Sequence, residues 1–137
     1  MRRFAAAFGI ADMHQPARMP NTRRALAAAE YARERGRLDA FRHGAMDAYW
    51  RDGLDLEDAS VIRAVAAAAG LEPAPTAAAM NDSVYLARVD DVRREASAAG
   101  VSGIPTFFLG DAVVVGCQPY PVLAAAAERA GARKRER

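Results

Sequence analysis

The sequence predicts a helix-rich α/β fold in one domain. Its 137 residues are enough for one domain and too few for two independent cores. Alanine accounts for 34 of them, and because alanine is the strongest helix former and buries little area, this content favours closely packed helices. Apolar residues recur at helical spacing through most of residues 21–100, whereas two β-prone runs follow residue 100.

The first twenty residues predict little regular structure. Residues 3–10 are Ala-rich and are expected to form the last turns of a helix that stops at Gly9. Pro16 and Pro20 push their preceding residues toward extended conformations, so residues 12–20 predict a strand or an irregular segment. The apolar stretch after Met1 is too short for an export signal and has no small-residue cleavage site, so we expect a cytoplasmic protein.

Four helices and one helical turn are predicted between residues 21 and 100. Asn21 or Thr22 can cap the first helix and Asp55 the third, because their side-chain oxygens accept from free N–H groups of a first turn. Pro73 and Pro75 separate the third helix from the turn. The predicted helices span 22–35, 38–51, 56–69 and 83–99, with the turn at 77–80, and they end at Gly36, Gly53, Gly70 and Gly100.

Each of these helices has an apolar stripe that is expected to be buried. The aromatic side chains are expected to pack the helices together, and lining a groove is an open alternative. The expected buried stripes are Phe41, Ala45, Ala48 and Tyr49; Val61, Ile62, Val65 and Ala69; and Tyr85, Val89, Val92 and Ala96, and the aromatic residues are Tyr31, Tyr49, Trp50 and Tyr85.

A hairpin and a final helix are predicted after residue 100. Residues 104–109 and 112–115 are β-prone, and Gly110-Asp111 between them is a plausible tight turn. The segment 116–119 breaks the second strand, and a helix over 120–130 follows, with Val122, Leu123 and Ala126 facing inward.

Charge and composition argue against several classes of partner. The 19 basic and 17 acidic residues alternate along the chain except in the tail 133–137. This alternation is not typical of a nucleic-acid interface. No apolar run reaches the roughly 18 residues that would span a bilayer, so no membrane partner is expected. His14 and His43 lie far apart without a neighbouring cysteine, so no metal site is predicted.

Pro105 is the first candidate site residue, because a proline cannot donate to a strand ladder and is confined to strand starts, edges and special turns. In the Gly103-Ile104-Pro105-Thr106 setting, a cis peptide bond would expose the backbone of Ile104. An ordinary trans proline at a strand start is the alternative, since only about 5% of X-Pro bonds are cis in folded proteins.

Three separated segments carry a family resemblance: residues 19–26 (MPNTRRAL), 101–107 (VSGIPTF) and 116–120 (GCQPY). In this order they resemble the DsbA-like thioredoxin-fold proteins, in particular the bacterial FrnE-like thiol–disulfide oxidoreductases. The resemblance covers nearly all of residues 1–137 and implies a single, N-terminally truncated domain with an incomplete thioredoxin-like fold. Residues 21–100 would be the inserted helical subdomain, and residues 101–131 the C-terminal ββα part of the core.

The resemblance also implies site roles and a partner. Pro105 would be the cis-proline that faces the redox pair of the family, and the Ile104 backbone would pair with an extended peptide or protein thiol substrate as an added strand. Thr106 would follow Pro105 into the sheet. These three residues, Ile104, Pro105 and Thr106, are therefore the expected substrate-binding residues.

The chain departs from the family at the redox pair. Such oxidoreductases carry Cys-x-x-Cys at a helix N-terminus, which lowers the thiol pKa, whereas Cys117 is the single cysteine here. We expect the family activity, disulfide exchange, to be absent from this chain alone, and a Cys-x-x-Cys to be encoded upstream of Met1. No catalytic residue is assigned with certainty.

Three interpretations of Cys117 stay open. It stands where the family commonly has a small residue, so a small, partly buried apolar side chain is the favoured interpretation. A reactive or glutathionylated thiol, which would make glutathione the one cofactor, and an intermolecular disulfide are the others.

Two further functions compete with the oxidoreductase hypothesis. One is a redox-inactive module that binds a peptide or partner chain through the helical groove and the Pro105 edge. The other is the related glutathione-dependent 2-hydroxychromene-2-carboxylate isomerase group, which usually has a Trp-Gly-x-Asp-Arg-Leu-like segment where this chain has residues 115–120 (VGCQPY).

A two-stranded hairpin without further strands is expected to expose one edge and an apolar face. Such an edge favours a homodimer or pairing with a strand of another chain. Without either, the chain is expected to be marginally stable. Phe107, Phe108 and residues 113–115 would drive the association.

Overall fold

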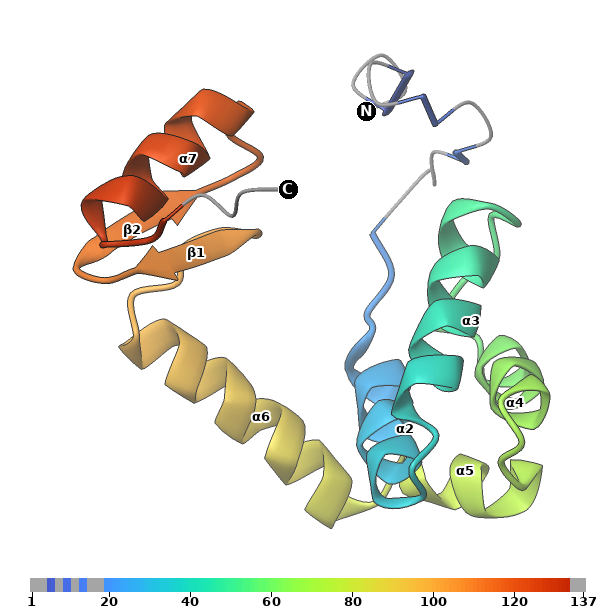
Figure 1. Cartoon of the computed structure of the whole chain (residues 1–137). Helices are drawn as coiled ribbons and strands as arrows, with labels where there is room; N and C mark the ends of the chain where they lie inside the picture. The colour runs from blue at the N-terminus through green and yellow to red at the C-terminus, as the bar shows by residue number, and fades with distance from the viewer. Residues whose placement is uncertain (1–4, 7–8, 11–12, 15–18, 134–137) are drawn as a thin grey trace. The chain divides into compact units, whose positions relative to one another are not determined.

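The computed structural model describes residues 5–6, 9–10, 13–14 and 19–133, and within them six helices and two strands form (Figure 1). The helix-rich α/β prediction is confirmed. The chain divides into two compact units, Met1–Val92 and Arg93–Arg137, which we call the helical unit and the hairpin unit. The elements are α2 (Arg23–Glu34), α3 (Leu38–Trp50), α4 (Ala59–Ala68), α5 (Pro73–Ala79), α6 (Ser83–Ala98), β1 (Thr106–Leu109), β2 (Ala112–Val115) and α7 (Tyr120–Arg129).

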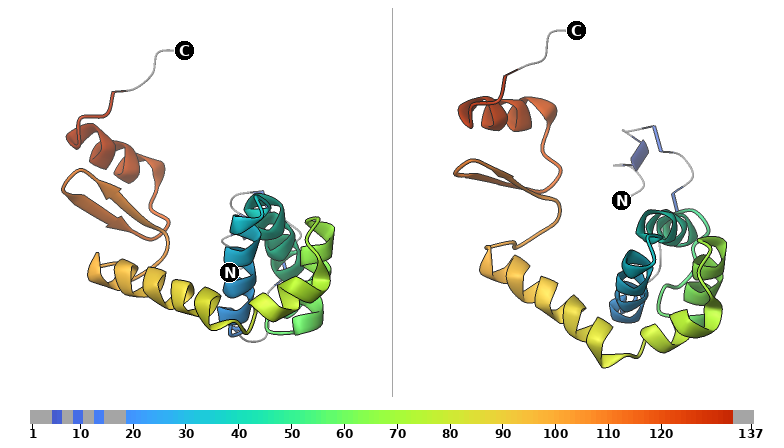
Figure 2. Two further views of the ribbon diagram at one scale, coloured as in Figure 1. Left: turned by 90° about the horizontal axis from the view of Figure 1, so that it is seen from below. Right: turned by 60° about the horizontal axis from the view of Figure 1, so that its bottom comes forward.

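The helical unit has its core between α2, α3, α4 and α5, which stay together in both views of Figure 2. Ile62, Phe41 and Met80 fill its centre with at most 2% of their surface exposed. Alanines that are fully buried on α2 and α4 let these helices approach closely, as the composition predicts. A Cβ at Gly44 on α3 would lie 3.3 Å from Val65 Cγ1 on α4, so this pair of helices is also closely packed.

Two helix starts differ from the prediction. Asp58, not Asp55, caps α4, because its Oδ1 accepts from the Ser60 N–H at 2.7 Å. The Asp55 carboxylate instead accepts from the Glu57 N–H at 2.9 Å in the preceding turn. The predicted turn at 77–80 is a longer helix that begins at Pro73, since a proline in the first turn gives up only an N–H that has no partner within the helix.

The buried stripe predicted for the last helix of the helical block is wrong. No residue of α6 is fully buried: Tyr85, Val89 and Ala96 are half-buried, and Val92 has 58% of its surface exposed. A periodic stripe shows only which face of a helix is apolar, whereas burial needs a partner surface against that face. The stripes of α3 and α4 find that partner in each other.

The hairpin unit is an antiparallel pair of strands with α7 against β2. Gly110 and Asp111 form the tight turn, as predicted, and the register pairs Thr106 with Val115 and Leu109 with Ala112. The first strand begins at Thr106 rather than at residue 104. On α7 the predicted inward residue Ala126 is buried, whereas Val122 is exposed, so that part of the prediction is wrong.

The predicted helix over residues 3–10 and the extended segment over residues 12–20 lie partly outside the described residues. The described residues of the second segment, 13–14 and 19–20, form no strand.

Candidate functional site

The segment before β1 is a tight turn with an exposed apex. The Ile104–Pro105 peptide bond is cis, and the Ile104 side chain is 90% exposed. The Thr106 Oγ1 donates to the Gly103 carbonyl at 2.5 Å, and the Pro105 carbonyl accepts from the Gly116 N–H at 2.7 Å. The turn is therefore joined to β2 on one side and presents Ile104 to solvent.

The register determines which backbone groups of β1 are free. Gly116 stands opposite Pro105 and donates to it, so Pro105 and every second residue after it direct their backbone groups toward β2. Thr106 and Phe108 alternate with these residues, so their N–H and C=O groups point away from β2. Within the described residues the sheet has two strands, so this edge is unpaired.

One face of the hairpin is apolar and uncovered within the hairpin unit. Phe108 and Val113 lie opposite each other and are each 53% exposed, and Val115 beside them is also exposed. On the other face Leu109, Ala112 and Val114 are half-buried. The expectation of an exposed edge and an apolar face is confirmed for the described residues.

Cys117 lies at the same end of the hairpin as Pro105. It follows Gly116, the residue opposite Pro105, and it is exposed. The expectation of a partly buried side chain is wrong, because Cys117 lies in the loop after β2 and not on the face that α7 covers. The turn brings Ile104, Pro105 and Thr106 together. Cys117 is the residue after Gly116, whose N–H bonds to the Pro105 carbonyl.

Two glycines that the sequence analysis did not assign to the site help to form it. Gly103 accepts the Thr106 hydroxyl, and Gly116 supplies the N–H that bonds to Pro105. A Cβ at Gly103 would lie 3.1 Å from Val115 Cγ1, so the backbone passes close to β2 here. The available sequence signal was the glycine on either side of the two β-prone runs.

A polar cluster joins the first half of α6 to α2, and we call it the α2–α6 cluster. The Tyr85 hydroxyl donates to Glu34 Oε2 at 2.7 Å, and Arg88 pairs with Glu34 Oε1. The pKa of Glu34 is lowered, mainly by the hydrogen bond from Tyr85 and then by the hydrogen bond from Arg88. The pKa of Tyr85 is raised, mainly by the same hydrogen bond to Glu34. Arg23 adds a bidentate contact to Asp90, at 3.1 and 2.6 Å.

The α2–α6 cluster is a structural contact rather than a catalytic one. Its charged side chains are exposed, and ion pairs of this kind contribute little each to stability. The aromatic packing predicted for this region is confirmed, since the rings of Tyr31 and Tyr85 meet edge to face with centroids 5.9 Å apart.

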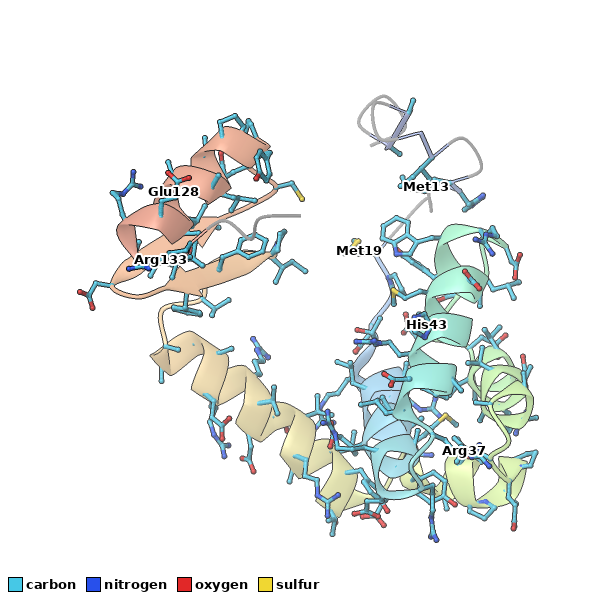
Figure 3. The ribbon with its side chains drawn as sticks, viewed as in Figure 1. Met13, Met19, Arg37, His43, Glu128 and Arg133 are labelled. Carbon is cyan, nitrogen blue, oxygen red and sulfur yellow. The ribbon has the colours of Figure 1, made fainter. Side chains whose placement is uncertain are left out.

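The two histidines do not form a site together. His43, labelled in Figure 3, lies on the exposed face of α3 with Nδ1 2.7 Å from the Asp39 carbonyl oxygen. The N–H of His14 donates to the Trp50 carbonyl at the end of α3. In the part of the chain that is described, no three His, Cys, Asp or Glu residues gather as metal ligands would, and no helix has the length and apolarity to cross a bilayer.

Comparison with known proteins shows a similar solved structure and a matching family model. A crystal structure of a probable DsbA oxidoreductase from Streptomyces coelicolor superposes with a TM-score of 0.75 and 28% sequence identity, over 99% of this chain. The chain spans 60% of the length of that protein. No curated protein matches the chain. A family model for the DSBA-like thioredoxin domain matches residues 1–128, and the chain therefore belongs to the DSBA-like thioredoxin domain family.

Proposed function

We propose that the hairpin unit binds an extended peptide by strand addition to β1, as the substrate-docking part of a FrnE-like thiol–disulfide oxidoreductase. The observation that carries this proposal is the β1 edge beside the exposed Ile104, which no other described strand pairs. The family membership and the likeness to a probable DsbA oxidoreductase support the class of reaction.

The edge supplies the groups that strand addition needs. The outward N–H and C=O groups of Thr106 and Phe108 are free to bond an incoming strand, and main-chain bonds of this kind provide affinity for many peptide sequences. Ile104 offers an apolar side chain next to them for contact with one peptide residue. Pro105, with its carbonyl held by Gly116, positions this turn at the start of the strand.

The same proposal assigns no independent disulfide exchange to the 137 residues. Oxidation of two thiols to one disulfide releases two electrons and two protons, and both sulfurs must belong to the reacting pair. Cys117 is the single cysteine of the chain, so it cannot close an intramolecular disulfide.

A proline pair tests the edge. Phe108→Pro removes an outward N–H from β1 without removing a bond of the hairpin ladder. Val113→Pro is the matched control, because Val113 lies opposite Phe108 and directs its N–H to the outer side of β2. An unstructured apolar peptide is titrated into the ¹⁵N-labelled chain, and the amide shifts of Phe107 and Val114 report whether the hairpin remains.

We expect the wild-type chain and Val113→Pro to bind the peptide, with shifts centred on Thr106, and Phe108→Pro to lose binding. Equal loss in both variants with an intact hairpin, or shifts outside the hairpin unit, would overturn strand addition at β1. If Phe108→Pro disrupts the hairpin, Thr106→Pro removes the neighbouring outward N–H and replaces it in the test.

The redox part is tested separately with a fluorescent disulfide peptide and glutathione. We expect no turnover by the 137-residue chain above the Cys117→Ser variant. Turnover that Cys117→Ser abolishes would contradict the proposal and assign a one-thiol mechanism. The intact mass and thiol count of the protein from its native source then test the expected upstream pair, because that pair predicts two further cysteines.

A homodimer through the same edge is the second part of the proposal. The hairpin carries a single charged residue, Asp111, at its turn, so like charges do not keep two β1 edges apart. Sedimentation of the chain over a range of concentrations is expected to show a monomer–dimer equilibrium that Phe108→Pro shifts to monomer. A monomer at all concentrations would refute the dimer and leave peptide binding intact.

The cytoplasmic location stays a prediction from the sequence.

A further inference from the structure

A surface pocket of about 290 Å³ lies in the helical unit, where the α2–α3 and α4–α5 turns meet. Tyr31 and Leu71, both nearly buried, and Pro75 form its apolar wall. Arg35 and Arg37 are its cationic lining residues, and Glu72 is its one carboxylate. The lining side chains therefore carry one net positive charge beside an apolar surface.

The two guanidinium groups have no acceptor in the described residues. Arg35 lies over the Tyr31 ring, with Cζ 5.0 Å from the ring centroid, and its charge helps to lower the pKa of Glu34. Among the described residues it has no hydrogen-bond or ion-pair partner within 4 Å. Arg37, labelled in Figure 3, also has neither, and its Cζ lies 3.8 Å from the position of a Cβ at Gly70. The two arginines thus approach the pocket from one turn with their N–H donors unused.

Helix capping does not account for these arginines. A basic side chain near a helix C-terminus often bonds to the last carbonyls, but backbone N–H groups already bond to three of the last four carbonyls of α2 and of α4. The Arg37 N–H donates to the Ala32 carbonyl at 2.8 Å, and the Leu71 N–H donates to the Ala66 carbonyl at 2.9 Å. The same kind of backbone hydrogen bond ends both helices. The guanidinium groups of Arg35 and Arg37 therefore remain available to donate to another acceptor.

We propose that this pocket binds a small carboxylate with an apolar body. The carboxylate would accept N–H groups of Arg37 and Arg35, whose planar donor sets match its two oxygens. The apolar body would rest on Tyr31, Leu71 and Pro75. The volume suits one ring with its carboxylate, since pockets for larger ligands run from about 300 to 1,000 Å³. This site is separate from the peptide edge and does not depend on it.

Benzoate is the probe, titrated into the full 137-residue chain and followed by ¹H–¹⁵N shifts. We expect saturable shifts at Gly70 and Leu71, and binding at least about tenfold weaker for benzamide, which has the same shape without the charge. Inorganic phosphate, an anion without an apolar body, is also expected to bind more weakly than benzoate. No saturable shift with benzoate, or shifts away from the pocket, would overturn the proposal.

Arg37→Met tests the assigned donor, because methionine retains apolar bulk and removes the charge. We expect it to weaken benzoate binding by about tenfold. Arg63→Met on the exposed face of α4 is the matched control, and it is expected to bind as the wild-type chain does. If Arg37→Met does not fold, Arg35→Met takes its place. Wild-type affinity in a folded Arg37→Met variant, or equal affinity for benzoate and benzamide, would refute the carboxylate assignment.

Discussion

Replacing Gly53 with alanine tests how His14 is held against the end of α3. Gly53 follows α3 with φ +69°, a left-handed conformation that residues with a Cβ rarely adopt. A Cβ there would lie 2.8 Å from His14 Cδ2 and 2.9 Å from His14 Cγ. Since the His14 N–H bonds to the Trp50 carbonyl at 2.5 Å, the ring must rotate or His14 must leave this contact.

Gly36→Ala separates the two contributions to the expected loss. Gly36 has φ +65°, but nothing lies within 4 Å of its Cβ position. Gly36→Ala therefore measures only the backbone contribution to the loss in the free energy of unfolding, which is about 1–2 kcal/mol for a left-handed residue. Gly53→Ala adds the displacement of His14, which is about 1–3 kcal/mol by analogy with overpacked sites. We expect Gly53→Ala to lower the free energy of unfolding by about 2–5 kcal/mol in total.

Urea unfolding followed by tryptophan fluorescence measures both variants. Trp50 is the only tryptophan, and it lies in the helical unit, so the signal reports this unit. His14→Ala combined with Gly53→Ala is expected to recover the excess loss. Equal destabilisation by Gly53→Ala and Gly36→Ala would refute the reasoning, because it would mean that the His14 ring does not resist the added methyl group.

Three further predictions follow from other parts of the molecule. Ile62→Ala is expected to lower the free energy of unfolding by about 2–5 kcal/mol in the same assay, since Ile62 is 1% exposed, and a loss under about 1 kcal/mol would contradict a packed core. A lowered carboxyl pKa stabilises the folded state above the ordinary pKa, and this contribution is lost as the pH falls through the lowered value. Tyr85→Phe should therefore raise the pKa of Glu34 and move that loss to higher pH, as an NMR titration of the Glu34 carboxyl would show; an unchanged midpoint would speak against the Tyr85 hydrogen bond. Cys117 is expected to react fully with a chromogenic disulfide without denaturant and to form a mixed disulfide with oxidised glutathione, and reaction only in urea would contradict its exposure.

The local elements and their order could be predicted from the sequence, because short-range physics controls them. Gly36 and Gly53 follow the ends of α2 and α3, and the tight turn at Gly110-Asp111 determines the pairing of β1 with β2. The segment before Pro105 was identified as a candidate site for a similar reason, since proline restricts where a strand can begin. The resemblance to the DsbA-like family rested on the same local segments.

Which apolar faces are covered and which distant groups meet depends on how the helices and strands pack together. The stripe of α6 satisfies the helical pattern, but only its first residue, Tyr85, packs against the helical core, and Val92 is exposed. Asp55 and Asp58 are both suitable caps, and the path of the chain into α4 selects Asp58. The pocket joins Arg37 to Leu71, residues separated by two helices, and helical periodicity carries no information about such long-range contacts. Sequence periodicity records the face of an element, whereas burial and sites depend on what the rest of the chain places against that face.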